Sequence, residues 1–94
     1  MAKVVVKVAI PSLLLAATGN ESEVRVEAET LAEALRTLVE SYPLLEVHLF
    51  QADGSVRPHV HLFYNDQNTR WLQSLDVPLE PGDTITVLQA VSGG

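Results

Sequence analysis

The sequence contains no cysteine among its 94 residues. That absence excludes disulfide bonds, thiolate metal ligands and a cysteine nucleophile. Long apolar runs are missing too, because Lys3 and Lys7 interrupt the first apolar segment and no run approaches the ~18 residues of a membrane span. No targeting segment is visible. We therefore expect a cytoplasmic protein without a membrane partner.

Basic residues are scarce. The chain has 6 Lys and Arg against 12 Asp and Glu, which gives a formal net charge of −6. Nucleic-acid binding needs clustered Lys and Arg to contact phosphates, so we predict no nucleic-acid partner. An acidic protein of this kind is attracted to a partner that carries a basic groove.

Residues suited to metal binding or catalysis form no recognisable site. His59 and His61 stand two residues apart, but zinc needs three or four ligands and only His48 remains as a third histidine. The spacing of the carboxylates is typical of a solvent-exposed surface, and no serine has a nearby base. We predict no metal site and no independent enzymatic activity.

The length fits a single domain, with no linker or repeat to suggest another. We expect a folded domain at residues 1–90 and a flexible tail at residues 91–94. A chain this short has a modest core and little room for a deep pocket. A function displayed on the surface or at a terminus suits it better.

Alternating or β-branched apolar residues predict strands. Four segments show this pattern: residues 3–10, 23–27, 59–64 and 84–90. Between the second and third, Thr30 and Glu33 form a capping box before an apolar stripe at helical spacing, and Pro43 ends the helix. The order predicts an α+β fold, with one main helix packed across a mixed sheet of four to five strands.

The other segments are less regular. We expect a loop at residues 12–22 and a short helical turn or irregular packed segment at residues 44–50. We also expect Trp71 to help cover one edge of the core, together with the apolar residues that follow it.

The sequence ends in Gly93-Gly94. Two residues without Cβ atoms can thread a narrow channel and let backbone approach a nucleotide closely. A carboxylate joined to AMP becomes an acyl group with a good leaving group. A persulfide can then convert it to a thiocarboxylate, which carries sulfur without any cysteine. The alternative is a frayed end with no role.

Motifs along the whole chain occur in a characteristic order. They are Ile10-Pro11, Thr18-Gly19, Thr30-Leu31, Tyr64-Asn65-Asp66, residues 79–85 and residues 90–94. In this order the chain resembles the MoaD/ThiS family of ubiquitin-like, β-grasp sulfur carriers. Asn65-Asp66 followed by Arg70-Trp71 is more similar to the carrier that serves cysteine synthesis than to the molybdopterin-synthase small subunit.

The resemblance implies a role for the tail. Gly94, supported by Gly93, would be adenylated by an E1-like activating enzyme that uses ATP. A sulfur donor, persulfide or sulfide, would convert it to a thiocarboxylate for a sulfur-accepting synthase in cysteine or molybdopterin synthesis. The chain itself would bind no cofactor. It would be a carrier substrate, or the small subunit of a sulfur-transferring synthase, and not an enzyme alone.

Strand parity also predicts a docking surface on the sheet face away from the helix. The predicted partner-binding residues are Val5, Phe63, Leu88, Val91 and Ser92. An exposed apolar cluster with a polar rim marks a partner site, although single exposed apolar residues are ordinary. The family pairing puts the first and last strands side by side, so we expect Val5 and Leu88 to be neighbours.

Two other functions stay open. The activated Gly94 could be joined to lysines of other proteins, which would make the chain a ubiquitin-like modifier. The domain could instead bind partners with no tail chemistry at all.

Overall fold

The computed structural model describes residues 3–89. The predicted tail residues Val91, Ser92, Gly93 and Gly94 lie outside the described residues, as do positions 1, 2 and 90.

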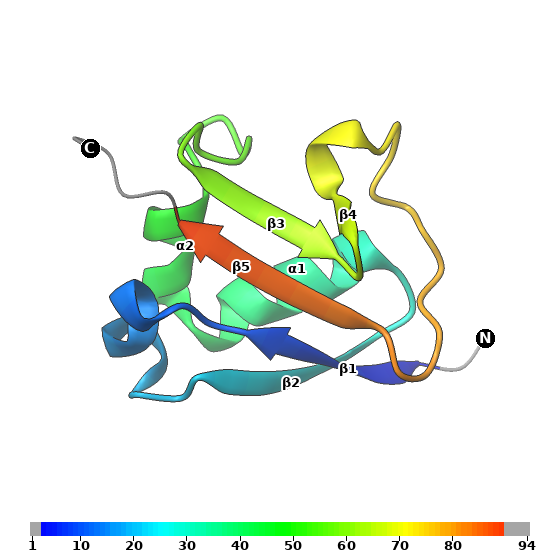
Figure 1. The fold of residues 1–94 in the computed structure, drawn as a ribbon, viewed down its shortest axis with the longest axis horizontal. Coiled ribbons are helices and arrows are strands. Elements are labelled where there is room, and N and C mark those ends of the chain that lie inside the picture. Colours follow the sequence, from blue (N-terminus) through cyan, green and yellow to red (C-terminus); the bar gives the residue numbers. More distant parts are fainter. Residues whose placement is uncertain (1–2, 90–94) are drawn as a thin grey trace.

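A mixed five-stranded sheet forms one layer of the molecule (Figure 1). Its strands are β1 (Val4–Ala9), β2 (Glu23–Ala28), β3 (Val60–Tyr64), β4 (Gln67–Asn68) and β5 (Thr84–Gln89). The spatial order is β2-β1-β5-β3-β4, with β5 parallel to β1 and antiparallel to β3. The predicted architecture is confirmed, including the pairing of the first strand with the last. β4 was not predicted, because a strand of two residues carries no alternation.

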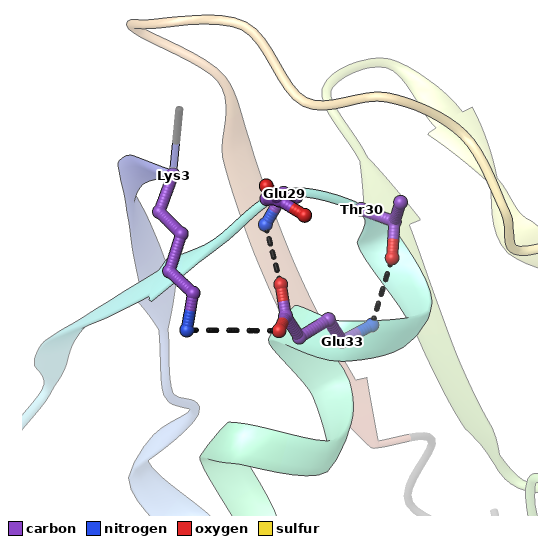
Figure 2. A network of polar contacts seen from close by, with 4 residues as sticks. All are labelled: Lys3, Glu29, Thr30 and Glu33. Carbon is purple, nitrogen blue, oxygen red and sulfur yellow. Dashed lines mark hydrogen bonds and ion pairs between the residues drawn. The ribbon is translucent and has the colours of Figure 1, made fainter. Parts of the chain in front are cut away.

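The main helix α1 (Leu31–Ser41) lies across one face of the sheet (Figure 1). It begins as predicted, because Thr30 Oγ1 accepts a hydrogen bond from the Glu33 N–H at 3.2 Å. The Glu33 carboxylate accepts a 2.6 Å hydrogen bond from the Glu29 N–H and lies 3.7 Å from the Lys3 ammonium (Figure 2). The capping box of α1 therefore includes the backbone N–H of Glu29, the residue before the N-cap Thr30.

The segment before β5 completes the start of α1. The first N–H groups of a helix have no partner within the helix. Here the Leu31 N–H donates to the Val77 carbonyl at 3.0 Å, and the Ala32 N–H donates to the Leu75 carbonyl at 2.9 Å. The segment that follows β4 is thereby tied to the helix N-terminus.

The core lies between α1 and the inner face of the sheet. Its fully buried side chains alternate along β1, β3 and β5 and repeat at helical spacing along α1. This agrees with the alternation of apolar residues in the predicted strands and with the apolar stripe of the predicted helix. The largest of them are Leu31, Leu38, Leu45, Leu49, Leu62 and Ile85.

Two helical segments pack at one end of the sheet. The predicted loop after β1 contains a 3-10 helix, η1 (Ser12–Thr18), which ends at Gly19 with a φ of 66°. The loop prediction was wrong there, because Leu14 is buried and a helical turn lets it reach the core. Residues 44–50 fall largely within a second α-helix, α2 (Pro43–Leu49), which contacts η1.

Trp71 does not cover the core, and that prediction was wrong. Its side chain is 78% exposed at the end of a short 3-10 helix, η2 (Thr69–Trp71). Only Thr69 of this turn is buried, so the two residues after it face outward. Leu72, Leu75 and Val77 do pack against the core, as expected.

Candidate functional site

The side of the sheet away from α1, here called the open face, holds the described part of the predicted site. Val5, Phe63 and Leu88 all belong to it, because each alternates along its strand with residues that are buried beneath α1. Their positions on the face follow from the strand registers.

Phe63 and Leu88 are brought together. In the β3–β5 ladder Phe63 pairs with Thr86, and His61 pairs with Leu88. Phe63 and Leu88 are therefore diagonal neighbours on one face, a separation of about 7–8 Å that large side chains can bridge. Leu88 is 46% exposed and Phe63 is half-buried. These two residues give the open face an apolar centre.

Val5 is not a neighbour of Leu88, and that prediction was wrong. The parallel β1–β5 ladder pairs Lys7 with Thr84 and Ala9 with Thr86. In this register Leu88 lies level with position 11, six residues beyond Val5, or about 20 Å along the strand. Knowing that two strands are adjacent does not fix their register, and here β5 begins opposite the middle of β1. Val5 instead pairs with Glu27 of β2.

Ala9 takes the place that Val5 was expected to fill. It is exposed, and it faces Thr86 across the β1–β5 ladder. The odd parity of the first strand extends to this residue and could have identified it. We call the group formed by Ala9, His61, Phe63, Thr86 and Leu88 the docking surface.

The docking surface lies at the end of the sheet toward which β5 runs. Leu88 is the penultimate described residue and precedes Gly94 by six positions. Helices η1 and α2 lie at the same end of the molecule (Figure 1). The docking surface thus extends to within one residue of Gln89, the last residue that the structure describes.

A polar contact adjoins this surface. Asn68 of β4 pairs with Phe63, and its side-chain amide Nδ2 lies 3.2 Å from Nδ1 of His61. Asn68 is also the N-cap of η2, because its Oδ1 accepts a hydrogen bond from the Arg70 N–H at 3.0 Å. The contact between His61 and Asn68 was not predicted, because Asn68 belongs to a strand of two residues that shows no alternation.

The other end of β5 holds the residues of two motifs on which the family resemblance rests. The Tyr64 hydroxyl donates a hydrogen bond to the Asp83 carboxylate, and the Asn65 amide donates to it at 3.2 Å. Burial of Tyr64, with its hydrogen bond to Asp83, raises the pKa of the phenol from 10.0 to about 12. Their hydrogen bonds join the end of β3 to the residue before β5, and we assign these motifs a structural role.

Burial acts to raise the pKa of Asp83, but hydrogen bonds outweigh it. They come from the Tyr64 hydroxyl, the Glu80 N–H and the Asn65 amide, and they lower the pKa below its ordinary value of 3.8. Asp83 is thus an ionised acceptor at neutral pH, with its oxygens already occupied by neighbours in the fold.

Among residues 3–89, no three His, Asp or Glu side chains gather as a group that could hold a metal ion. His59 lies in the turn before β3, outside the strand that carries His61. Within the same residues, no helix is long and apolar enough to span a membrane.

Two open hollows have volumes of about 240 and 440 Å³, and α1 lines the smaller one. Both are lined by Phe50, Gly54 and Leu75, and neither includes a residue of the docking surface. No chemically reactive cluster lines them.

Curated relatives cover between about two thirds of the chain and nearly all of it. The sulfur carrier protein CysO of Mycobacterium tuberculosis is 30% identical over 91 residues, which span 95% of this chain and 98% of that protein. Small archaeal modifier protein 3 of Haloferax volcanii is 34% identical over 65 residues, which span 69% of this chain and 70% of that protein.

Solved structures share the fold. The structure of the BexX/CysO complex of Amycolatopsis orientalis matches with a TM-score of 0.81 and 28% identity, covering 95% of this chain and 99% of the matched one. The archaeal modifier SAMP1 of Haloferax volcanii matches with a TM-score of 0.79 and 27% identity, covering 96% and 99%. The fold is therefore the predicted ubiquitin-like β-grasp.

The model of the ThiS family matches residues 8–94, which include every residue of the docking surface and the Gly93-Gly94 pair. The chain therefore belongs to the ThiS family.

Proposed function

We propose that this protein carries sulfur as a thiocarboxylate on Gly94. The observation that supports this most is the similarity to a named sulfur carrier over 95% of the chain. The family match, which extends to Gly94, agrees with it. The absence of cysteine is consistent as well, because an acyl-bound sulfur needs no thiol side chain.

The chemistry has two steps. The Gly94 carboxylate attacks the α-phosphate of ATP on an E1-like activating enzyme, which forms an acyl-adenylate and releases pyrophosphate. Sulfide then attacks the acyl carbon, AMP leaves, and a thiocarboxylate remains. With a persulfide as donor, the first product is an acyl disulfide, and a second thiol must cleave its S–S bond to release the thiocarboxylate.

In this proposal the protein supplies the acyl group and the means of docking, and the partner supplies catalysis. The docking surface binds the activating enzyme through Phe63 and Leu88, while residues 91–94 enter its active site. Glycine at positions 93 and 94 lets the backbone pass where a Cβ atom would obstruct it. The net charge of −6 favours a partner with a basic groove.

The sulfur is then passed to an acceptor bound by a synthase. We propose cysteine or molybdopterin synthesis as the destination. The similarity to the sulfur carrier CysO, and a structural neighbour in which CysO forms a complex with a second protein, BexX, support transfer of sulfur to a partner protein. The chain would be a substrate or small subunit in that assembly.

Complementation tests this proposal. In cells that lack the gene, the unchanged protein should restore synthesis of the sulfur-containing product. A variant with one alanine added after Gly94 should not restore it, although it folds normally. If the extended variant restores growth fully, the domain works without tail chemistry and is an interaction module.

A second function has its own support, because a relative is named a modifier protein. In that case the activated Gly94 would be attacked by lysine amines, and the product would be an isopeptide. Proteolytic digestion of cell extracts would then yield lysines that carry a Gly-Gly remnant of this chain. Their absence, in cells grown with and without sulfur, would leave sulfur carriage as the only use of the activated tail.

A further inference from the structure

We propose that His61 determines which partner the docking surface accepts, by presenting a Nε2–H donor that Asn68 holds in place. This inference rests on the proposed function, since it specifies how the activating enzyme is recognised. It concerns the one titratable side chain in the group formed by Ala9, His61, Phe63, Thr86 and Leu88.

The position of His61 makes it part of any complex formed at this surface. It lies directly across the ladder from Leu88 and two residues from Phe63 on the same face of β3. Val60 and Leu62, on either side of it, are completely buried, so the imidazole points to the open face. The ring is half-buried already, and a partner seated on Leu88 would cover it further.

The orientation of the Asn68 amide is fixed by a separate contact. The Arg70 backbone N–H can only donate, and it lies 3.0 Å from one side-chain atom of Asn68. That atom must therefore be the amide oxygen, and the other must be the NH2 group. The NH2 group is the one that lies 3.2 Å from Nδ1 of His61.

The tautomer of His61 follows from this geometry. Because the Asn68 NH2 group only donates, Nδ1 of His61 must be the acceptor. A neutral imidazole with Nδ1 as acceptor carries its proton on Nε2. Among residues 3–89, Nε2 has no hydrogen-bond partner, so this N–H is free to meet a partner protein.

Arg70 holds the arrangement together. Its guanidinium donates to the carbonyls of Arg57, Pro58 and Val60 at 2.9, 3.1 and 2.9 Å. These bonds fasten η2 to the chain that leads into β3, while the ladder between Phe63 and Asn68 fastens the other side. Asn68 is thus a positioning residue, and its amide meets His61 without any adjustment on binding.

The chemistry of a matching partner can be stated. An apolar surface that covered Leu88 and Phe63 would also bury the Nε2–H, and a buried donor without an acceptor opposes binding. A partner with a backbone carbonyl or a carboxylate opposite His61 would satisfy it. The docking surface therefore selects an activating enzyme with an apolar patch that contains one hydrogen-bond acceptor.

The tautomer is tested without any partner. Long-range ¹H–¹⁵N NMR spectra of the neutral imidazole should show the proton of His61 on Nε2. Asn68→Asp keeps an oxygen for the cap but replaces the donor with an acceptor, so Nδ1 should become protonated in that variant. A wild-type ring that carries its proton on Nδ1 would overturn the inference.

Binding of the activating enzyme from the same genome, measured by calorimetry without ATP, tests the donor itself. His61→Phe keeps the apolar surface but removes the donor, and its Kd should rise about tenfold, or about 1.4 kcal/mol. His61→Gln, whose amide NH2 group can stand in for Nε2–H, should recover most of that loss. Equal affinity for His61→Phe and the wild type would contradict the inference.

The two proposals can fail separately. If His61→Phe binds normally while Gly94 still gains sulfur, the His61 inference fails alone. If the wild-type protein binds the enzyme, His61→Phe binds less tightly and Gly94 never gains sulfur, the proposed function fails alone. If the wild-type protein does not bind that enzyme at all, both fail.

Discussion

The hydroxyl of Tyr64, at the end of β3, donates a hydrogen bond to the carboxylate of Asp83, just before β5 begins. This bond joins two motifs that are nineteen residues apart in the sequence. It gives the Tyr-Asn pair and the Gly-Asp turn a structural role, because it holds the end of β3 against the residue before β5. The hydrogen bond between Tyr64 and Asp83 makes the stability of the fold depend on pH.

At alkaline pH the Tyr64 contribution should disappear. Its pKa is raised to about 12 in the folded protein, from 10.0 when unperturbed. Its contribution is therefore complete below about pH 10 and is lost as the pH rises toward about 12. The difference in unfolding free energy between the wild type and Tyr64→Phe, from urea titrations, should be constant up to about pH 9 and shrink above about pH 10. A difference that stays constant to about pH 12 would contradict this assignment.

At acidic pH the contribution of Asp83 to stability should disappear. The pKa of Asp83 is lowered in the fold, so its contribution is present above 3.8, the ordinary value, and is lost as the pH falls through the lower, folded value. The stability difference between the wild type and Asp83→Asn should therefore narrow below about pH 4. Asp66→Asn, which changes an exposed carboxylate outside this pair, is the matched control.

Replacement of Asn65 by glycine should destabilise the fold less than replacement by alanine. Its φ is 53°, in the left-handed region, and its side chain both accepts from the Thr84 N–H at 2.9 Å and donates to Asp83. Asn65→Gly loses the hydrogen bonds but relieves the backbone, whereas Asn65→Ala loses the bonds and adds about 1–2 kcal/mol of backbone strain. Thermal unfolding should rank the wild type above glycine and glycine above alanine. The reverse order of the two variants would show that the backbone is not constrained there.

The capping box should contribute through hydrogen bonds and not through charge (Figure 2). Thr30→Ala removes the acceptor for the Glu33 N–H and should cost about 1 kcal/mol, or a decrease in Tm of about 4–8 °C. Glu33→Gln keeps an acceptor for the Glu29 N–H and should cost much less than Glu33→Ala. The ion pair with Lys3 is exposed, so the loss of charge should matter little. If Glu33→Gln were as unstable as Glu33→Ala, charge would be the main term.

Leu88 and Val5 provide a matched test of the docking surface. Both are about half exposed on the same face, but only Leu88 adjoins Phe63. Leu88→Gln should weaken binding of the activating enzyme by about tenfold or more, as expected for a central apolar contact. Val5→Gln should change the Kd by less than about twofold. An equal loss for both variants would mean that the partner covers the whole face.

Local signals in the sequence predicted the elements well, while contacts between distant segments were harder to predict. Thr30 and Glu33 fixed the start of α1 because a cap depends on four successive residues. The register of β5 against β1 depends on the loop before Thr84 and on packing beneath α1, so the neighbours of Leu88 could not be derived from parity. The contact of Asn68 with His61 depends on β4, a strand too short to show a pattern.

Trp71 shows the same limit in another form. Its type favours the interior, but the turn that contains it buries Thr69 and leaves the indole outside. Arg70 determines this orientation of the turn, because its guanidinium donates hydrogen bonds to three carbonyls before and within β3. A bond of that kind between separate segments leaves no sign in composition or periodicity.

The central claim concerns the acyl group of Gly94, and intact-mass spectrometry tests it directly. The protein is incubated with its activating enzyme, ATP and sulfide, beside a variant that carries one alanine after Gly94. We predict that the unmodified chain gains the mass of one oxygen-to-sulfur exchange at its last residue and that the extended variant gains none. An unchanged mass, with no acyl-adenylate trapped when sulfide is left out, would contradict the account.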